Sequence, residues 1–587
     1  MGEFVGIDPR RAAELIRQMA SSKDVLGRTR GGLEAAIFEA GASWTGPAGV
    51  AAMHRSWAFF DEAQRDLEWR IDTLKQLVPS AGSGLLSVFL PFNSETEATR
   101  QGKTDGGLIA EALKQHEIEN SLDSWRKVTE ATAATKEKLN DPAYTAALLN
   151  ALGPDKFRAL FMHWMKSKVP AMDKGLSPAA LQEGRKSLGP LAEAYANAER
   201  AGRLGEEWGE KFIATTQPGV LTALVAMSKP SPKLLNQVAL RVLGRPLGAD
   251  LPSSQNWNLN ILVDAYDADP QALQTLLAKN KDAAGWLLHP QRARMSGIPD
   301  FEQKMADVLD KALRPGAGLD SVRDQAWFNI IREMGAEDSP WIGGAWGTIK
   351  DSPISEALAK NVTPYLDQLT RGQLKVSSSD LVALHPGETP WHRLDPHDAE
   401  RFIGGLMQDK DAAKILMQAA QDYMSGLDIG RFSPSSPDKG IQAEFISRHA
   451  LAGGAASLML SGSAYAEWTD DEYSEWLAST ATLPIDWLSN RFWPIQDATA
   501  ATSRDAGLDS LKDGVKGMIT DYLDKKTPDA ASEVADKIIE RQVAWTVLSM
   551  QQHGQEPLTS YQIDDLRAAF RGRLYNPLKD ALERRGG

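Results

Sequence analysis

The chain has 587 residues, of which 42% are hydrophobic and 24% are charged, and this composition is ordinary for a globular protein. A formal net charge of −13 argues against broad nucleic-acid binding, which requires an extended basic surface. Cysteine is absent, which excludes disulfides, thiolate zinc sites and a cysteine nucleophile.

Helix-forming residues dominate the chain. Alanine, leucine, glutamine, glutamate and lysine are plentiful, whereas runs of valine, isoleucine and threonine are scarce. We therefore predict an all-α fold, with an N-terminal antiparallel helical hairpin followed by a large multi-helix body. No stretch reaches about 18 consecutive strongly apolar residues, and the N-terminus lacks a basic region followed by an apolar core. The sequence thus predicts neither a stable membrane-spanning segment nor a conventional signal peptide.

Residues 1–79 contain two long helical patterns on either side of a turn at Gly41–Gly49. The first runs from about Asp8 to Ala40, because Asp8 followed by proline is a good helix start, and the second runs from about Pro47 to Val78. Steps of three and four define a weak seam in the first pattern, formed by Ala12, Leu15, Met19, Ser22, Leu26, Thr29, Leu33, Ala36 and Ala40. A stronger seam follows in the second, formed by Val50, Met53, Trp57, Phe60, Gln64, Leu67, Ile71 and Leu74.

Three features of the hairpin bear on its packing. Gln64 is the polar member of the second seam, and a lone polar residue there can fix the register of the two helices. Gly27, Gly31 and Gly32 weaken the first helix, or else allow a second helix to approach closely. Two helices of this length cannot bury both faces alone, so we expect the hairpin to pack on another hairpin or on the body.

The turn carries Trp44, Thr45 and Gly46 between two long heptad arms. This arrangement resembles the WXG (ESAT-like) family of type VII (ESX-type) secretion substrates. The resemblance implies export as a folded helical dimer that a membrane ATPase recognises. The chain departs from the family in lacking a Tyr-x-x-x-Asp/Glu signal directly after the second helix. The alternative is an ordinary hairpin with a buried tryptophan at its turn. The whole chain also resembles long actinobacterial proteins with a WXG-like front and a helical body.

The remainder of the chain is expected to form a linker and three helical segments. Residues 80–107 form the linker, with an apolar island near Leu85–Leu90 that docks on the body; the helical segments are 108–334, 335–495 and 496–587. Ser or Asp repeatedly precedes proline where a helical pattern begins, as a capping residue does. The pairs are Asp141-Pro142, Ser177-Pro178, Ser231-Pro232, Asp269-Pro270, Ser352-Pro353 and Asp395-Pro396. We interpret them as recurrent helix starts; the alternative is a diverged helical repeat, although their spacing is irregular.

Two polar clusters are candidate chemical sites. Trp391–Glu400 contains His392 and His397 with three carboxylates, which could hold a metal or act as acid and base. The favoured interpretation is a helix start capped by Asp395. Thr469–Glu472 with Glu475 could bind a divalent metal, but acidic residues also stabilise the first turn of a helix. We predict a capped helix here too.

Two partial motifs are rejected. Gln101–Thr104 ends like a P-loop, but Glu97 occupies the position of its first glycine. His116–Asn120 begins like a zincin helix, but Asn120 replaces its second histidine.

The 17 tryptophans are interpreted as packing anchors, with a ligand-stacking surface as the alternative. The basic tail from Arg567 to Arg585 is interpreted as a solvated helix face, with an acidic partner as the alternative.

These patterns lead to a functional expectation without a catalytic, metal or cofactor site. The protein is expected to be a non-enzymatic type VII–associated component, either an export substrate or a structural one, which is cytoplasmic before export and then secreted or at the cell surface. Its partners would be a small helical protein, the secretion machinery or a second copy. Trp44 and Gly46 shape the turn, and the packing face comprises Met53, Trp57, Phe60, Leu67 and Ile71. The alternatives are a polymorphic toxin with a C-terminal enzymatic domain and an intracellular helical scaffold.

Overall fold

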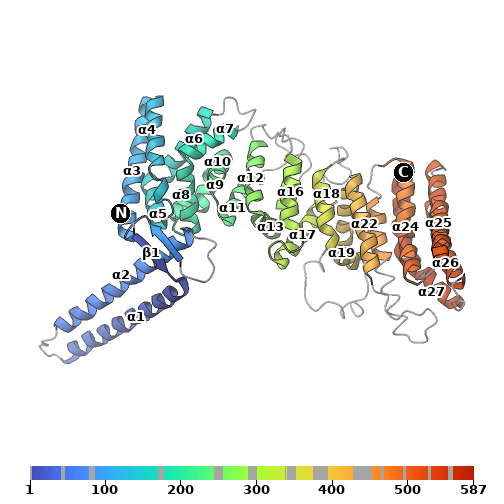
Figure 1. Cartoon of the computed structure of the whole chain (residues 1–587), viewed down its shortest axis with the longest axis horizontal. Coiled ribbons are helices and arrows are strands. Elements are labelled where there is room, and N and C mark those ends of the chain that lie inside the picture. The colour runs from blue at the N-terminus through green and yellow to red at the C-terminus, as the bar shows by residue number, and fades with distance from the viewer. Residues whose placement is uncertain are drawn as a thin grey trace. The chain divides into compact units, whose positions relative to one another are not determined.

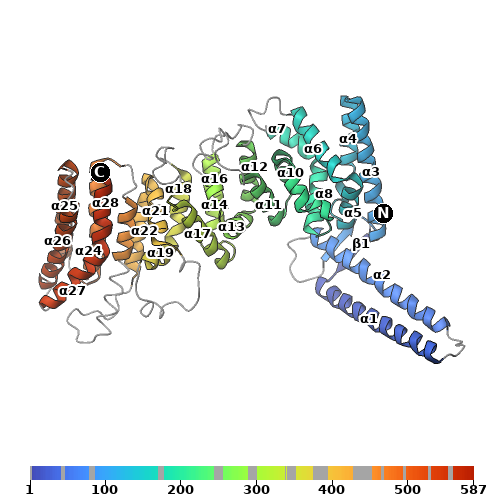
Figure 2. The same cartoon turned by 180° about the vertical axis from the view of Figure 1, so that it is seen from behind.

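The computed structural model describes most of the chain. The described residues are 3–40, 47–77, 86–168, 178–243, 256–288, 301–337, 339, 352–373, 394–427, 453–463, 468–492, 498–525, 530–552 and 559–586. The chain divides into two compact units, Met1–Ala265 and Tyr266–Gly587, which we call unit 1 and unit 2. Helices make up nearly all of the regular structure of both units (Figures 1 and 2), and the predicted all-α class is confirmed.

Unit 1 begins with a strand and then alternates helices with short connections. Its elements are β1 (Glu3–Ile7), α1 (Pro9–Ala40), α2 (Pro47–Leu77), β2 (Leu86–Leu90), α3 (Glu95–Glu119), α4 (Leu122–Ala133), α5 (Pro142–Leu152), α6 (Pro154–Lys168), α7 (Pro178–Ser187), α8 (Gly189–Arg200), α9 (Glu210–Thr215), α10 (Pro218–Met227), α11 (Pro232–Leu243) and α12 (Asn256–Ala268), the last of which runs past the unit boundary.

All the regular secondary structure of unit 2 in its described residues is helical. Its elements are α13 (Pro270–Lys279), α14 (Ala283–Leu287), α16 (Phe301–Leu313), α17 (Asp320–Met334), α18 (Pro353–Val362), α19 (Leu366–Gln373), α21 (Pro396–Met407), α22 (Lys410–Gly426), α24 (Asp470–Phe492), α25 (Ala498–Lys525), α26 (Ala530–Gln552), α27 (Ser560–Phe570), a π-helical turn (Arg571–Tyr575) and α28 (Asn576–Gly586). The boundary expected between residues 334 and 335 falls inside this unit.

The predicted helix starts are confirmed wherever they lie in the described residues. Asp141 accepts hydrogen bonds from the backbone N–H groups of Ala143 and Tyr144, each at 2.9 Å, and so satisfies two donors that the first turn of α5 leaves unpaired. The other predicted pairs with an observed cap are those of Ser231, Asp269, Ser352 and Asp395. Asp409 caps α22 without a following proline. Ser177 lies outside the described residues.

A two-stranded antiparallel ribbon is formed by the segments that precede and follow the N-terminal hairpin. Strands β1 and β2 pair from Glu3 with Leu90 to Ile7 with Leu86. The segment 80–107, expected as a linker, therefore contains a strand and the first half of α3. The apolar island was expected, but its pairing as a strand was not. Its partner strand lies at the start of the chain, and a pairing between such distant segments leaves no local sequence signal.

The helices of unit 1 pack around a tight contact between α3 and α5. A Cβ atom added at Gly102 would lie 2.4 Å from the carbonyl oxygen of Tyr144, and one added at Gly106 would lie 2.3 Å from that of Leu148. Glycine at these two positions is what allows the helix backbones to meet. Further along unit 1, the rings of Phe157, Tyr195, Trp208 and Phe212 form a fully buried aromatic cluster.

Unit 2 arranges its first helices in two rows. In one row α13 contacts α17 and α17 contacts α21; in the other α16 contacts α18, α18 contacts α22 and α22 contacts α24. Alternating contacts of this kind are typical of stacked helix pairs. The helix starts in the first row, Pro270, Asp320 and Pro396, are unevenly spaced in the sequence. Trp327, fully buried in α17, packs near Tyr365 and Phe402, as expected for an anchoring tryptophan.

Candidate functional site

Helices α1 and α2 lie side by side as a long hairpin (Figures 1 and 2). Lys23 of α1 links them: its ammonium group forms an ion pair and hydrogen bond with Asp61 and lies 3.4 Å from the side-chain oxygen of Gln64. The hydrogen bond from Lys23 lowers the pKa of Asp61. The Lys23 ammonium also lies 5.3 Å from the ring centroid of Trp57. Gln64 therefore does contact the opposite helix, as expected for a polar seam residue.

The predicted seam of α2 is only partly covered by α1. Ile71 is buried, Met53, Phe60 and Leu67 are half-buried, and Trp57 is 38% exposed. Burial thus increases from the outer part of the helix towards its base, where unit 1 adds contacts. The predicted turn residues Trp44 and Gly46 lie outside the described residues.

The predicted seam of α1 needs a correction. Leu15 and Leu33 were placed in the seam, yet they are 44% and 37% exposed, whereas Ile16 and Met19 are half-buried. Leu15 and Leu33 are 18 residues apart, which is about five helical turns, so they lie on one line beside the contact with α2. No described residue approaches a Cβ atom placed at Gly27, Gly31 or Gly32, so these glycines do not serve the packing of α1 on α2.

Large apolar side chains remain exposed along the outer part of the hairpin. Among the described residues, twelve large hydrophobic side chains are exposed, and six of them belong to α1 and α2. These six are Leu15, Val25, Leu33, Phe38, Trp57 and Phe59, and Phe38 is 89% exposed. We call Leu33, Phe38, Trp57 and Phe59 the outer apolar residues. Trp57 and Phe59 are two positions apart, roughly 200° around α2, so they lie on opposite sides of that helix. Exposed apolar side chains gathered on one element are typical of an interaction surface.

The base of α2 is joined to the start of α5 by a buried hydrogen bond. The indole Nε1 of Trp69 donates to Oδ2 of Asp141 at 2.9 Å, and both residues have no exposed surface. Burial raises the pKa of Asp141 to about 6, even though its hydrogen bonds favour the charged form. Trp69 lies two residues from Ile71, roughly 200° around the helix, so it faces away from α1. The predicted seam of α2 lies on the side of Ile71, and no buried residue was expected on this second face.

Neighbouring side chains reinforce this junction. The Tyr144 hydroxyl donates a hydrogen bond to Asp105 of α3, and Lys138 forms an ion pair with the same carboxylate at 2.8 Å. The ring of Tyr144 stacks on Phe92, with centroids 5.4 Å apart, directly after β2. The end of the ribbon, α3 and α5 are thereby fixed to one another next to the Trp69–Asp141 bond.

A serine and two histidines lie close together where α3, α4 and α6 meet. The Nε2 atoms of His116 and His163 are 2.9 Å apart, and Nδ1 of His116 is 2.8 Å from Oγ of Ser124. The arrangement superficially resembles a nucleophile with its base. However, Ser124 is buried and its hydroxyl already contacts Ser121 as part of the capping box of α4. The cluster therefore contributes to the packing of α3, α4 and α6, and we assign it no catalytic role.

The partial motifs of α3 have structural roles. Gln101–Thr104 lies inside the helix, so it forms no phosphate-binding loop. His116 lies in the last turn of α3, and Asn120 adopts a left-handed conformation, with φ of 45°, as the C-cap residue. Asparagine tolerates this conformation better than most residues.

The cluster around Asp395 is a capped helix start, as the favoured interpretation predicted. Asp395 accepts from the N–H of His397 at 2.9 Å, and Asp398 pairs with Arg401 at 2.8 Å. Nδ1 of His397 is 3.2 Å from a carboxylate oxygen of Glu400, at an exposed site. His392 lies outside the described residues. No group of three or more His, Asp or Glu in the described residues could hold a metal ion.

The acidic run at the start of α24 is a joint between helices. Thr469 and Glu472 exchange the hydrogen bonds of a capping box. Glu472 pairs with Lys410 of α22, which lowers its pKa to about 2. Asp471 pairs with Lys516 of α25 at 3.0 Å. Each of these carboxylates therefore has a cation from a different helix.

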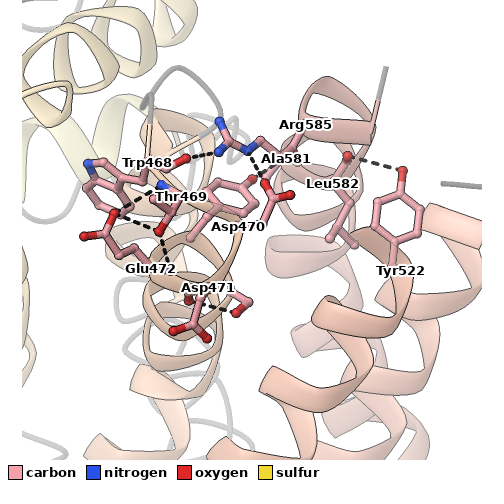
Figure 3. A network of polar contacts seen from close by, with 11 residues as sticks. Trp468, Thr469, Asp470, Asp471, Glu472, Tyr522, Ala581, Leu582 and Arg585 are labelled. Atoms are coloured by element: carbon pink, nitrogen blue, oxygen red, sulfur yellow. Dashed lines mark hydrogen bonds and ion pairs between the residues drawn. The ribbon is translucent and has the colours of Figure 1, made fainter. Parts of the chain in front are cut away.

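The C-terminal helix α28 is held by the same joint (Figure 3). Arg585 donates to Asp470 at 3.2 Å and to the carbonyl oxygen of Trp468, and it lies over the ring of Tyr473. The hydroxyl groups of Tyr473 and Tyr522 donate to the backbone carbonyl groups of Ala581 and Leu582.

Other cations of the basic tail are paired too. Arg567 pairs with Glu540 and Asp564, and Arg571 pairs with Asp536 at 3.1 Å. The tail was expected to be a solvated face with an acidic partner as the alternative. Arg567, Arg571 and Arg585 instead connect helices of unit 2, whereas Lys579 pairs with Glu583 within α28.

Comparisons of the chain with protein-family models, curated proteins and solved structures returned no match. In the described residues, no helix is both long and apolar enough to cross a membrane.

Proposed function

We propose that the protein is a non-enzymatic, type VII–associated component that binds a helical protein partner through the α1–α2 hairpin. The support is the concentration of exposed apolar side chains on this hairpin, which holds six of the twelve found in the described residues. The type VII assignment rests on the resemblance of residues 1–79 to the WXG family.

The composition of the outer hairpin favours a protein partner. Between Gly31 and Trp57 the only charged residues are Glu34, Glu39 and Arg55, against 24% for the whole chain. Cores of protein interfaces are depleted in charge and enriched in aromatic residues and methionine. A helical partner would bind one side of the outer hairpin, with Phe38 and Phe59, the two most exposed aromatic residues of the hairpin, as candidate anchors.

The junction at Trp69 suits this role. Binding to a fixed element costs less conformational entropy than binding to a loose one. The buried Trp69–Asp141 bond and the β1–β2 ribbon attach both ends of the hairpin to unit 1. The hairpin can therefore present its outer apolar residues without ordering its base on binding.

The test is a comparison of co-purifying proteins from the native host. The variant Trp57→Asp with Phe59→Asp changes exposed side chains and leaves the half-buried Phe60 in place. The matched control is Leu548→Asp, which alters a similarly exposed apolar residue in unit 2. We expect the double variant to lose a small helical protein or a secretion ATPase that the control retains. Identical partner lists for both proteins would contradict the proposal.

A second measurement addresses export. Full-length protein and a version lacking residues 1–80 are compared in washed cells and culture medium, with a cytosolic enzyme as the marker of lysis. We expect the full-length protein in the medium and the truncated one in the cells. Retention of both in the cells would leave docking without export, as in the alternative of an intracellular scaffold.

A further inference from the structure

Two histidines from different helices of unit 1 bring their Nε2 atoms together. His116 lies in the last turn of α3 and is buried, whereas His163 lies on α6 and is half-buried. Their Nε2 atoms are 2.9 Å apart. The indole ring of Trp125 of α4 packs against both imidazole rings, with centroids 5.3 Å from that of His116 and 4.6 Å from that of His163. Three helices thus hold the pair, and solvent reaches it at His163.

Hydrogen bonds fix the protonation of His116. The hydroxyl group of Ser124 donates to the carbonyl oxygen of Ser121 at 2.9 Å. The hydroxyl oxygen of Ser124 is 2.8 Å from Nδ1 of His116, and it therefore accepts from an Nδ1–H group. A neutral His116 then carries no proton on Nε2, so this atom offers a lone pair. A hydrogen bond to the other ring nitrogen is also the arrangement that orients histidine ligands of metal ions.

The contact between the two imidazole rings is bent. The ring centroids of His116 and His163 are 4.3 Å apart, and the ring planes are nearly perpendicular, at 84°. An in-line N–H···N hydrogen bond of this length would separate the centroids by about 5 Å, because each centroid lies about 1 Å behind its nitrogen. At least one Nε2 atom therefore points beside the other and not at it, as both do when two imidazoles bind one ion.

The distance between the two nitrogens selects the class of ion. Imidazole nitrogens lie about 2.0–2.1 Å from a divalent transition-metal ion, so two nitrogens 2.9 Å apart subtend an angle of about 90° at the ion. A tetrahedral Zn²⁺ site requires an angle of about 109°, which would separate the nitrogens by about 3.3 Å. Right angles between nitrogen ligands are typical of tetragonal Cu²⁺ and Ni²⁺ sites.

We propose that His116 and His163 bind a Cu²⁺ or Ni²⁺ ion through their Nε2 atoms, with water in the remaining positions. Cu²⁺ should bind more tightly, as the order of affinities of divalent ions requires. Burial, with smaller effects of His116 and Lys166, lowers the pKa of His163, and the neutral ring is the form that a ligand requires. Lys166 is exposed, so solvent screens its repulsion of the ion.

A bound ion would join the end of α3 to α6. Structural metal sites are closed by four protein ligands, whereas this pair supplies two, so the ion should exchange with solution. The site is independent of the hairpin and of the function proposed for it.

The experiment titrates the full-length protein with Cu²⁺ at neutral pH, with glycine present as a competing chelator of weakly held ions. Calorimetry measures the affinity, and electron paramagnetic resonance at substoichiometric Cu²⁺ reports the ligands. We expect one site that outcompetes glycine and whose spectrum shows coupling to two imidazole nitrogens. A spectrum without this coupling would overturn the proposal, as would tighter binding of Zn²⁺ than of Ni²⁺ in parallel titrations.

Variants then locate the site. His163→Gln and His116→Gln each remove one ligand, and they do so on different helices. His397→Gln is the matched control, because this exposed histidine lies 3.2 Å from a carboxylate oxygen of Glu400 and could hold an adventitious ion. Each of the first two changes should weaken the tightest Cu²⁺ site at least about tenfold, and the control should leave it unchanged. Circular dichroism verifies that each variant is folded. Unchanged Cu²⁺ affinity in either folded ligand variant, or equal weakening by His397→Gln, would reject the site.

Discussion

The indole nitrogen of Trp69 and the carboxylate of Asp141 form a buried hydrogen bond of 2.9 Å between residues that lie 72 positions apart in the chain. Asp141 also caps α5, so one carboxylate both starts a helix of unit 1 and holds the base of the hairpin. The loss of either partner should therefore affect the attachment of the hairpin.

Replacement of Trp69 by phenylalanine should lower the stability of unit 1. The change keeps most of the apolar volume but removes the N–H donor, which leaves a buried carboxylate oxygen unpaired. Such a loss typically costs about 1–3 kcal/mol. Urea unfolding, followed by circular dichroism, measures the difference. The control is Trp57→Phe, because Trp57 is 38% exposed and its ring keeps the contact with Lys23. Equal effects of the two changes would argue against a specific role of the Trp69 bond.

The stability of the protein should depend on the ionisation of Asp141. Burial raises its pKa to about 6 from an ordinary value of 3.8, so the folded protein binds more protons than the unfolded chain between these values. The contribution of Asp141 to stability therefore increases as pH falls through about 6 and becomes constant below about 4. Asp141→Asn removes this titration. The difference in free energy of unfolding between native chain and variant should shift in favour of the native chain between about pH 7 and about pH 5. A constant difference would refute the assignment.

Two adjacent glycines of α3 should respond oppositely to alanine. At Gly106 a Cβ atom would lie 2.3 Å from the carbonyl oxygen of Leu148, so Gly106→Ala must separate α3 from α5, at a cost of about 1–3 kcal/mol. At Gly107 nothing lies within 4 Å of the new atom. Gly107→Ala should stabilise the helix by up to about 1 kcal/mol. Thermal unfolding of both variants tests the pair, and destabilisation by Gly107→Ala would contradict the described packing.

Tyr473→Phe should loosen the C-terminal helix of unit 2. The change retains the ring beneath Arg585 but removes the hydroxyl that donates to the carbonyl oxygen of Ala581 at 2.8 Å. The carbonyl oxygen of Ala581 lies inside α28 and keeps its backbone hydrogen bond, so the change removes one additional side-chain hydrogen bond, which is worth about 0.5–1.5 kcal/mol. Hydrogen exchange of α28 should become faster. Tyr561→Phe is the control, since Tyr561 is 74% exposed and its replacement should leave exchange in α28 unchanged.

Local chemistry made the helix boundaries predictable. The starts at Asp141, Asp269 and Asp395 depend on a capping carboxylate and the proline that follows it, and all three are observed. The two hairpin helices were expected from about Asp8 to Ala40 and from about Pro47 to Val78, and they span Pro9–Ala40 and Pro47–Leu77. Each of these predictions uses residues only a few positions apart.

Contacts between distant segments were not predictable in the same way. Trp69 follows Glu68 in a stretch that reads as a solvated face, and only its contact with Asp141 makes that face buried. Leu15 and Leu33 fit the heptad pattern, but the observed contact lies beside them. Amphipathic spacing identifies an apolar stripe, whereas the rotation of the helix about its axis depends on its neighbour.

The register of the β1–β2 ribbon also determines how the hairpin responds to mechanical force. The chain leaves β1 at Ile7 to form the hairpin and re-enters the ribbon at Leu86, and these two residues are paired. A pull on the hairpin away from α3 would load this pair together with the Trp69–Asp141 bond at the base of α2, and then Gly6 with Ser87. Antiparallel strands opened from one end release their hydrogen bonds in succession, like a zipper, and not all at once as under shear. The ribbon end next to the hairpin would thus separate before the pair of Glu3 and Leu90 at its other end.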